Sequence, residues 1–205
     1  NLAEEVILRI GGNPFLVRAG ALYHDIGKTN QPAYFIENQA AGMSPHSKLD
    51  NKESAKIIID HVTRGVKIAR RNKLPEVLIE FISSHHGTSQ AKYFYTTYKN
   101  EHPDEEVDPK EFTYPGPPPK NKETSVVMLI DGIEAAARAM KEKSLENLRA
   151  LIEKIVQDKI DTGQLDNADL TLREIRIVKE TILEKLMNIY HVRIEYPEDK
   201  TQKKQ

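Results

Sequence analysis

Six histidine and aspartate side chains stand out among the 205 residues, because they occur on segments that otherwise read as apolar helix. They lie at four places along the chain, twice as adjacent pairs: His24, Asp25, His61, His85, His86 and Asp131. Asp131 directly follows the apolar run VVMLI, where a buried carboxylate without a partner would be costly. A cation should therefore meet it, and the whole set of nitrogen and oxygen donors predicts a buried site for two metal ions.

The spacing of these residues indicates how they would share two ions. Consecutive side chains on a helix diverge by about 100°, so His24 and Asp25 are expected to straddle two ions in one pocket rather than chelate a single ion. His85 and His86, at the end of an apolar helix pattern, could present two imidazoles to one ion. Small residues about one turn from His24 and from His61 are expected to leave room for the ions: Gly20, Ala21, Gly27 and Gly65.

Each of these residues, taken alone, also has a simpler explanation. Asp131 could pair with a basic residue further along its helix, Arg138 or Lys141. A single histidine on an apolar face is more often a hydrogen-bonded core residue than a metal ligand, and this explanation is taken for the remaining histidines, His46, His102 and His191. The occurrence of six donors together favours the metal site.

Three further polar residues lie close to the candidate ligands in the sequence. Lys28 is four residues after His24 and Arg64 is three residues after His61, so each shares a helix face with a ligand. Both could be solvated surface charges, but the position also suits an anion, and both are predicted as substrate contacts. Thr88, just after the histidine pair, is predicted as a third contact. The nearby tyrosines are expected to serve packing rather than base stacking: Tyr93, Tyr95 and Tyr98.

The composition excludes several classes of protein. The chain has no cysteine, which rules out disulfides and thiolate metal ligands and fits a reducing compartment such as the cytoplasm. The formal net charge is -1, so bulk binding of DNA is not expected. The apolar runs are far shorter than the roughly 20 residues that span a bilayer, so no direct membrane insertion is expected. The 39% hydrophobic content and the length predict one domain with a sizeable core.

Apolar periodicity and capping signals predict an all-α fold. The residues that read as helix N-caps are Asn13, Asp50, Ser144 and Thr171, the last with Glu174 as a capping box. Only 192–196 alternates like a strand. The stretch 31–49 contains two prolines and a glycine and is predicted as a long loop with one turn near 34–39. Helices are expected over residues 2–10, 14–27, 50–72, 75–87, 124–140, from 144 onward, and over 171–189.

Residues 1–196 are predicted to form a single domain. The proline-dense stretch 101–121 is interpreted as a surface excursion of that domain rather than a linker, because Asp131 lies beyond it and belongs to the same candidate site. The charged residues 197–205 are expected to fray as a tail. The chain begins at Asn1 without an initiator Met or a signal-like segment, so we expect it to be a fragment of a longer protein.

Longer segments around the six residues are similar to known proteins. The motif HDIGK at 24–28, a later histidine on a helix, a His-His pair and a distal aspartate resemble the HD superfamily of metal-dependent phosphohydrolases. More narrowly, NPFLVRAGALYHDIGKTNQPAYFIENQ, SPHSKLDNKESAKIIIDHVTRGVKIARRNKLP and FISSHHGTSQAKYFY resemble the cytosolic HD domain of seven-transmembrane HD receptor proteins. That family includes membrane-anchored cyclic di-AMP phosphodiesterases. The resemblance covers nearly the whole chain.

This resemblance implies an HD-domain helical bundle with additional C-terminal helices. It also implies two transition-metal ions bridged by Asp25, with His24 and Asp131 on one ion and three histidines on the other: His61, His85 and His86. The donor set favours manganese or iron. Asp25 and Lys28 would be the catalytic residues, and a hydroxide activated by the two ions would hydrolyse cyclic di-AMP to pApA. The chain would then be cytoplasmic, as the cytosolic domain of a multi-pass membrane protein.

Two departures from related patterns matter. The family pattern has a further histidine ligand upstream of the segment that begins at Asn1, so one ligand of the first ion is expected outside this chain. In the neighbouring HD-GYP cyclic di-GMP phosphodiesterases, an acidic residue and a GYP tripeptide follow the histidine pair. Here the pair is followed by Gly87, Thr88 and Ser89, which favours cyclic di-AMP as the substrate.

Three alternatives remain open at the level of sequence. The chain could be another HD enzyme, either a nucleotide phosphohydrolase or a di-iron oxygenase. It could be a sensor domain that binds a nucleotide without cleaving it, or a helical module with a structural metal. The oligomeric state is also left open.

Overall fold

The structure, a computed structural model, describes residues 2–39 and 44–192 and confirms the all-α fold class. Within these ranges there are eight α-helices and no β-strand, apart from an isolated antiparallel bridge between Gln90 and Thr113. None of the described helices is long and apolar enough to cross a membrane. The helices are α1 (Leu2–Arg9), α2 (Pro14–Tyr23), α3 (Asn51–Arg71), α4 (Glu76–Ser84), α5 (Lys92–Glu101), α6 (Lys122–Ala139), α7 (Leu145–Asp161) and α8 (Leu172–Ile189). Short 3-10 helices lie between them: η1 (Ile26–Asn30), η2 (Pro32–Tyr34), η3 (Ile36–Asn38), η4 (Pro45–Lys48) and η5 (Pro109–Phe112).

Several polar residues that read as helix starts in the sequence cap helices in the structure. The side chain of Asn13 accepts hydrogen bonds from two backbone N–H groups in the first turn of α2. Asp50 and Ser144 cap α3 and α7 in the same way. Thr171 and Glu174 form the reciprocal capping box that the sequence predicts for α8. These local bonds fix where each helix begins.

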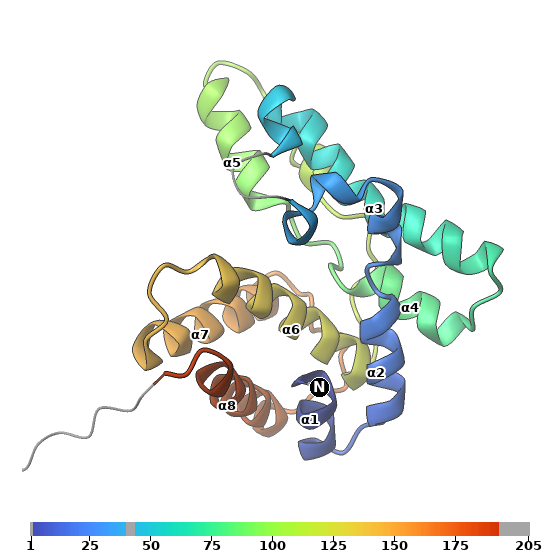
Figure 1. Cartoon of the computed structure of the whole chain (residues 1–205), viewed down its shortest axis with the longest axis vertical. Coiled ribbons are helices and arrows are strands. Elements are labelled where there is room, and N and C mark those ends of the chain that lie inside the picture. The colour runs from blue at the N-terminus through green and yellow to red at the C-terminus, as the bar shows by residue number, and fades with distance from the viewer. Residues whose placement is uncertain (1, 40–43, 193–205) are drawn as a thin grey trace, which may run out of the picture.

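The main core lies between α1, α2, α6, α7 and α8 (Figure 1). Helix α6 is its central element, because every residue from Thr124 to Ile130 is buried, and this explains the apolar run before Asp131. The apolar faces of α7 and α8 pack in this core through Leu148, Ile152, Val156, Val178, Ile182 and Leu186. Asp131 is therefore carried to the edge of the core by a helix whose position is fixed by burial.

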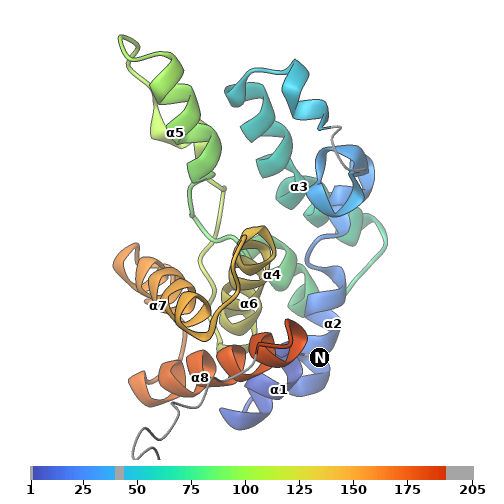
Figure 2. The same cartoon turned by 60° about the vertical axis from the view of Figure 1, so that its left-hand side comes forward.

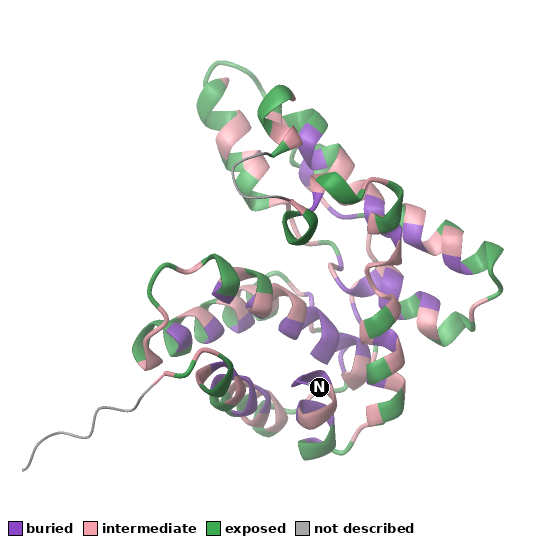
Figure 3. Cartoon of the chain, in the orientation of Figure 1, coloured by how far each residue is buried: buried purple, intermediate pink, exposed green. Residues whose placement is uncertain are grey.

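A second part of the molecule rises from this core and is built on α3 (Figures 1 and 2). Helix α5 and η5 pack against α3, and Phe112 of η5 is fully buried in contact with Tyr95 and Tyr98. Buried residues continue from the core along α4 into α3 (Figure 3). A small apolar cluster joins these two helices through Ala69, Ile79 and Ile82. The middle of α3, with His61, is thus held between the two parts.

Three elements differ from the sequence predictions. The helix predicted over 14–27 ends at Tyr23, and the chain continues as η1, so the pair His24 and Asp25 lies at the junction between them. The tyrosine-rich stretch, for which no element was predicted, forms α5. The described part of the loop 31–49 contains η2, η3 and η4 rather than a single turn.

The proline-dense stretch 101–121 only partly fits the predicted surface excursion. Its first half is largely exposed, but Phe112, Tyr114 and Pro119 are buried. Backbone hydrogen bonds from Tyr114 N to Ser89 O (2.9 Å) and from Ala91 N to Phe112 O (2.7 Å) tie it to the segment after the histidine pair. The stretch therefore packs against the segment that follows His85 and His86. The tail 197–205 and all but the first residue of 192–196 lie outside the described residues, and the single domain over 1–196 stays a prediction.

Candidate metal centre

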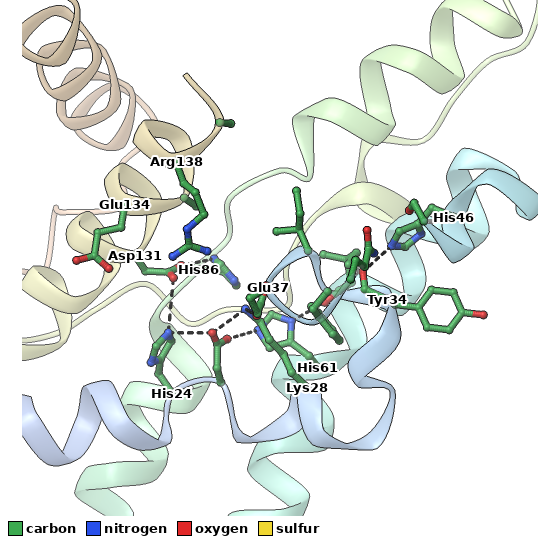
Figure 4. A pocket seen from close by; sticks show the side chains of 18 of the residues that line it. His24, Lys28, Tyr34, Glu37, His46, His61, His86, Asp131, Glu134 and Arg138 are labelled. Carbon is green, nitrogen blue, oxygen red and sulfur yellow. Dashed lines mark hydrogen bonds and ion pairs between the residues drawn. The ribbon is translucent and has the colours of Figure 1, made fainter. Parts of the chain in front are cut away.

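All six predicted ligands converge at one place in the structure. Figure 4 labels His24, His61, His86 and Asp131 around it. They come from four places in the fold: the junction between α2 and η1, the middle of α3, the turn after α4, and α6. They form two groups of three, and within each group the donor atoms lie within 4.8 Å of one another. The groups are His61, His85 and His86, and His24, Asp25 and Asp131.

The carboxylate of Asp25 lies between the two groups. Its Oδ2 is 3.2 Å from His24 Nε2, whereas its Oδ1 is 3.4 Å from His61 Nε2 and 3.6 Å from His85 Nε2. On the far side of the centre, Asp131 Oδ1 is 3.6 Å from His24 Nε2. Each oxygen of Asp25 thus faces a different group, which is the arrangement that a carboxylate shared by two ions requires.

The expected geometry of the His24 and Asp25 pair needs a correction. The sequence prediction separates them by the 100° step of a regular helix. In the structure both belong to one group of donors, although His24 keeps helical dihedral angles (φ -53°, ψ -35°), and only Asp25 also faces the other group. Asp25, with φ of -99° and ψ of 12°, begins the 3-10 turn instead.

Backbone carbonyl groups fix the orientation of three imidazole rings. The Nδ1 atoms of His24, His61 and His85 lie 2.8, 2.5 and 2.9 Å from carbonyl oxygens three residues earlier, those of Ala21, Ile58 and Ile82. A carbonyl oxygen can only accept, so Nδ1 must donate its proton, and in the neutral ring Nε2 then presents a lone pair to the centre. Histidines that bind metals are commonly held in this way.

Several donor atoms at the centre have no protein partner that satisfies them. His24 Nε2 and Asp25 Oδ1 are buried and make no hydrogen bond to any residue that the structure describes. His61 Nε2 and His85 Nε2 are 3.0 Å apart, and with both protons held on Nδ1, two lone pairs would face each other. Cations at the two groups would relieve this repulsion and satisfy the buried atoms. The residues present therefore fit a pair of metal ions held by nitrogen and oxygen donors.

Charge and burial set the protonation of the donors. Burial by itself would lower the pKa of His24, but the carboxylates of Asp131 and Asp25 reverse this effect and raise it to about 10. Burial would raise the pKa values of both aspartates, yet the surrounding imidazoles hold them below their usual range. Burial lowers the pKa values of His85 and His86. Ionised aspartates and neutral histidines are the forms that bind metal, so binding would release the proton of His24.

Close packing of η1 on α3 brings the two groups of donors together. A Cβ atom on Gly27 would lie 1.8 Å from the carbonyl oxygen of His61 and 2.6 Å from the backbone nitrogen of Gly65. The sequence predicts that Gly27 and Gly65 leave room for ions, but the space beside them is filled by contact between the two backbones. Gly27 therefore sets the distance between Asp25 and His61.

Tyr114 covers one side of the centre and was not predicted from the sequence. Its ring stacks on His86 with the ring centroids 4.2 Å apart, and it meets His61 edge-on at 6.1 Å. Tyr114 is only 8% exposed, and burial raises the pKa of its hydroxyl, which therefore stays protonated. The residue lies in the proline-dense stretch, where no periodic pattern marks a buried position.

A pocket of about 580 Å³ opens onto the centre, a volume within the range of small-molecule sites. Five of the six candidate ligands line it, His85 being the exception. The wall on the α3 and α5 side is mainly aromatic, with Tyr34, Phe35, Phe94 and Tyr114, whereas the opposite wall is α6, with Glu134 and Arg138. The combination of aromatic rings, charged groups and candidate metal ligands suits a nucleotide.

Lys28 is the only one of the three predicted substrate contacts that lines this pocket. Its Nζ lies 2.6 Å from Asp25 Oδ2 and 2.8 Å from Glu37 Oε1. His46, assigned to the core in the sequence analysis, is half-buried in the pocket wall, where its Nε2 lies 2.9 Å from the carbonyl oxygen of Tyr34.

The other two predicted substrate contacts, Arg64 and Thr88, do not line the pocket. Arg64 donates to Gln31 Oε1 at 2.6 Å and pairs with Asp60 at 3.4 Å, so its guanidinium is held along α3 outside the pocket. Thr88 is held by Gln164: its N–H donates to Gln164 Oε1 (2.9 Å), and its Oγ1 accepts from Gln164 Nε2 (3.0 Å). Both residues lie close to a candidate ligand in the sequence, but neither side chain lines the pocket that these ligands line.

Comparison with known proteins identifies the family. A model of the HD domain matches residues 1–136. The chain belongs to the HD domain family. This HD domain is 41% identical over 200 residues to the "Cyclic-di-AMP phosphodiesterase PgpH" of Listeria monocytogenes, and 42% identical over 198 residues to the protein of the same name from Bacillus subtilis. These alignments cover 98% and 97% of the chain, but the chain spans only 28% of the length of each relative.

Solved structures extend the similarity to the whole fold. The crystal structure of the L. monocytogenes phosphodiesterase PgpH HD domain matches with a TM-score of 0.87 at 39% identity, over 93% of this chain and 89% of that one. The structure of that domain in complex with cyclic-di-AMP matches with a TM-score of 0.89, also at 39% identity, over 93% of this chain and 88% of that one.

The turn that carries the histidine pair of this HD domain is anchored from the far end of the chain. Gln164 follows α7, beyond the region matched by the family model, and is 2% exposed. Besides its bonds to Thr88, its Nε2 donates to Thr162 O at 3.0 Å. Gln164 therefore fixes the backbone two residues after His86, and no local signal in the sequence predicts this role.

The change Gln164→Ala is expected to weaken metal binding about tenfold or more, because it frees the backbone that orients His85 and His86. Competition with a chelator would measure the affinity, and melting of the metal-free protein would show that the fold is kept. Gln157→Ala is the matched control, since it removes an exposed glutamine of α7 that bonds Asp161. Equal metal affinity in the two variants would contradict the anchoring role.

Proposed function

We propose that this HD domain is a metal-dependent phosphodiesterase that hydrolyses cyclic di-AMP to the linear dinucleotide pApA. The observation that carries this proposal is the Asp25 carboxylate, whose two oxygens face two separate groups of donors beside a pocket of nucleotide size. The choice of substrate is supported by two relatives that are named cyclic-di-AMP phosphodiesterases and by the related HD domain crystallised with cyclic-di-AMP.

The proposed ligand set assigns one ion to each group of donors. His61, His85 and His86 would hold one ion, His24 and Asp131 would hold the other, and Asp25 would bridge the two. Imidazole and carboxylate ligands without thiolate favour manganese or iron. When bound, such a pair of ions supplies a hydroxide nucleophile at neutral pH and stabilises negative charge on phosphate oxygens.

The residues of the chain would position the reacting groups. The carbonyl bonds to Nδ1 hold three imidazoles with Nε2 toward the centre, so little reorganisation is needed when substrate binds. Lys28, held between Asp25 and Glu37, would offset the charge that builds up as the bond between phosphorus and the 3′-oxygen breaks. Tyr114 and Phe35, both buried, would keep water from the side of the centre that faces α3. One water is consumed: its oxygen joins phosphorus, and the 3′-oxygen leaves as a hydroxyl.

We further propose that the chain acts in the cytoplasm as one domain of a longer membrane protein. Its resemblance to the cytosolic HD domain of seven-transmembrane HD receptor proteins supports this location. The chain also spans 28% of the length of each PgpH relative, which leaves most of such a protein to other segments.

Product analysis tests the proposed function. The metal-free protein would be supplied with manganese or iron and, in separate reactions, with cyclic di-AMP, cyclic di-GMP or a deoxynucleoside triphosphate. We expect pApA to form from cyclic di-AMP faster than any product from the other two, and chelation to stop the reaction. Faster hydrolysis of the triphosphate, or oxygen uptake with iron, would indicate another HD enzyme instead.

A further inference from the structure

Arg138 lies on α6 in the pocket wall opposite Lys28. It is seven residues after Asp131, which places the two side chains on one face of the helix about 10 Å apart along its axis. Helical side chains lean toward the helix N-terminus, so the Arg138 side chain leans back toward Asp131. Figure 4 shows its guanidinium extending into the pocket on the side of Asp131 and His86.

Within the described part of the chain, the guanidinium of Arg138 forms no ion pair and donates no hydrogen bond. Burial raises the pKa of Glu134, and the positive charge of Arg138 offsets part of this rise without a direct contact. Glu134, one turn earlier on α6, is the residue with which an ordinary surface pair would form. Figure 4 shows that Glu134 points away from Arg138, and the two form no ion pair. A surface salt bridge therefore does not explain the position of Arg138.

Lys28, the other pocket residue with a permanent positive charge, is in the opposite situation. Its ammonium contacts both Asp25 and Glu37, which hold it beside the candidate metal centre, where the reacting phosphate would lie. Of these two cations, Arg138 is thus the one that no carboxylate contacts and that can meet a second anionic group away from that centre. Its planar fork of N–H donors matches the oxygens of a phosphate better than an ammonium does.

We propose that Arg138 binds the second phosphate of a cyclic dinucleotide, the one that is not at the candidate metal centre. This inference rests on the proposed function. A cyclic dinucleotide carries two phosphodiesters on opposite sides of its ring, so only one can lie between the two groups of donors at a time. The other must face a wall of the pocket, and Arg138 is two helical turns from Asp131 on the α6 wall. Arg138 is therefore a specificity residue that favours a substrate with two phosphates over a simple diester.

Steady-state kinetics with two substrates test this role in the manganese-loaded protein. Cyclic di-AMP has the second phosphate, whereas bis(p-nitrophenyl) phosphate has only the diester that reacts. For Arg138→Ala we expect kcat/KM to fall about tenfold or more further for cyclic di-AMP than for the nitrophenyl diester, mainly through KM, as loss of a charged hydrogen bond implies. Arg138→Lys should recover part of this loss. Lys141→Ala removes a positive charge just beyond α6, outside the pocket, and should leave kcat/KM unchanged for both substrates.

The outcomes separate this inference from the proposed function. An equal fall for both substrates, or a fall in kcat alone, would overturn the role of Arg138 while the parent protein still cleaves cyclic di-AMP. A phosphorothioate analogue of cyclic di-AMP that resists cleavage gives the dissociation constant without turnover. If the parent cleaves the nitrophenyl diester but neither cleaves nor binds the cyclic dinucleotide, the proposed substrate is wrong, and the inference fails with it.

Discussion

Replacement of Asp25 by asparagine is expected to lower turnover of cyclic di-AMP about 1,000-fold or more, which corresponds to about 4 kcal/mol of lost transition-state stabilisation. Asparagine has nearly the same shape, but it has no negative charge and only one oxygen. In the structure one oxygen of Asp25 faces His61 and His85, and the other faces His24 and the ammonium of Lys28. A single amide cannot serve both groups, so the proposed bridge between the ions is lost.

Metal content and turnover should be measured together for Asp25→Asn. We expect fewer than two manganese ions per chain after dialysis, and no recovery of full turnover at high manganese. Asp158→Asn is the matched control, because Asp158 also holds a lysine, Lys92, but lies on α7 away from the pocket. Two tightly bound ions and near-normal turnover in Asp25→Asn would show that this carboxylate is not the bridge.

The candidate ligands could be predicted from sequence because each interrupts a strong local pattern. Asp131 follows a run that is buried from Thr124 to Ile130, and the histidine pair ends the apolar helix α4. The helix caps were predictable for the same reason, since Asn13 needs only the two N–H groups next to it. Signals of this kind depend only on residues within about one helical turn, so they can be recognised without knowing how distant segments pack.

The residues that shape the centre could not be predicted, because their roles depend on contacts between distant segments. Gln164 holds Thr88 across 76 residues of sequence. Tyr114 stacks on His86 from a stretch whose prolines suggest only an extended surface. Arg64 is a case in which the local signal was not enough. Its helix face predicted a substrate contact, but Gln31, 33 residues earlier, holds its guanidinium outside the pocket. Periodicity shows which face of an element is apolar, but not which segment packs on it.

Gly27 has both a local signal in the sequence and a role that depends on a distant segment. As a small residue near His24 it was visible in the sequence, but its contact with α3 was not. The change Gly27→Ala is expected to destabilise the metal-free protein by about 3 kcal/mol or more, a large part of the roughly 5–15 kcal/mol that stabilises a typical domain. The added Cβ would lie 1.8 Å from the carbonyl oxygen of His61 and 2.6 Å from the nitrogen of Gly65. Both are backbone atoms, so no side-chain rotation can relieve the clash, and η1 must move away from α3.

Gly132→Ala is the control, and its effect should have the opposite sign. Gly132 lies inside α6, and the nearest atom to an added Cβ is Ile155 Cγ2 at 3.9 Å, an ordinary contact. Alanine is favoured over glycine in a helix by roughly 0.8–1.0 kcal/mol, so this variant should be slightly more stable. Urea unfolding of both metal-free variants would measure the difference. If Gly27→Ala unfolds at the same urea concentration as the parent, η1 does not pack on α3 as closely as the structure shows. In that case Gly27→Ala should also bind metal with the affinity of the parent, because the distance between Asp25 and His61 would not depend on Gly27. A metal titration of the folded variant would measure this affinity.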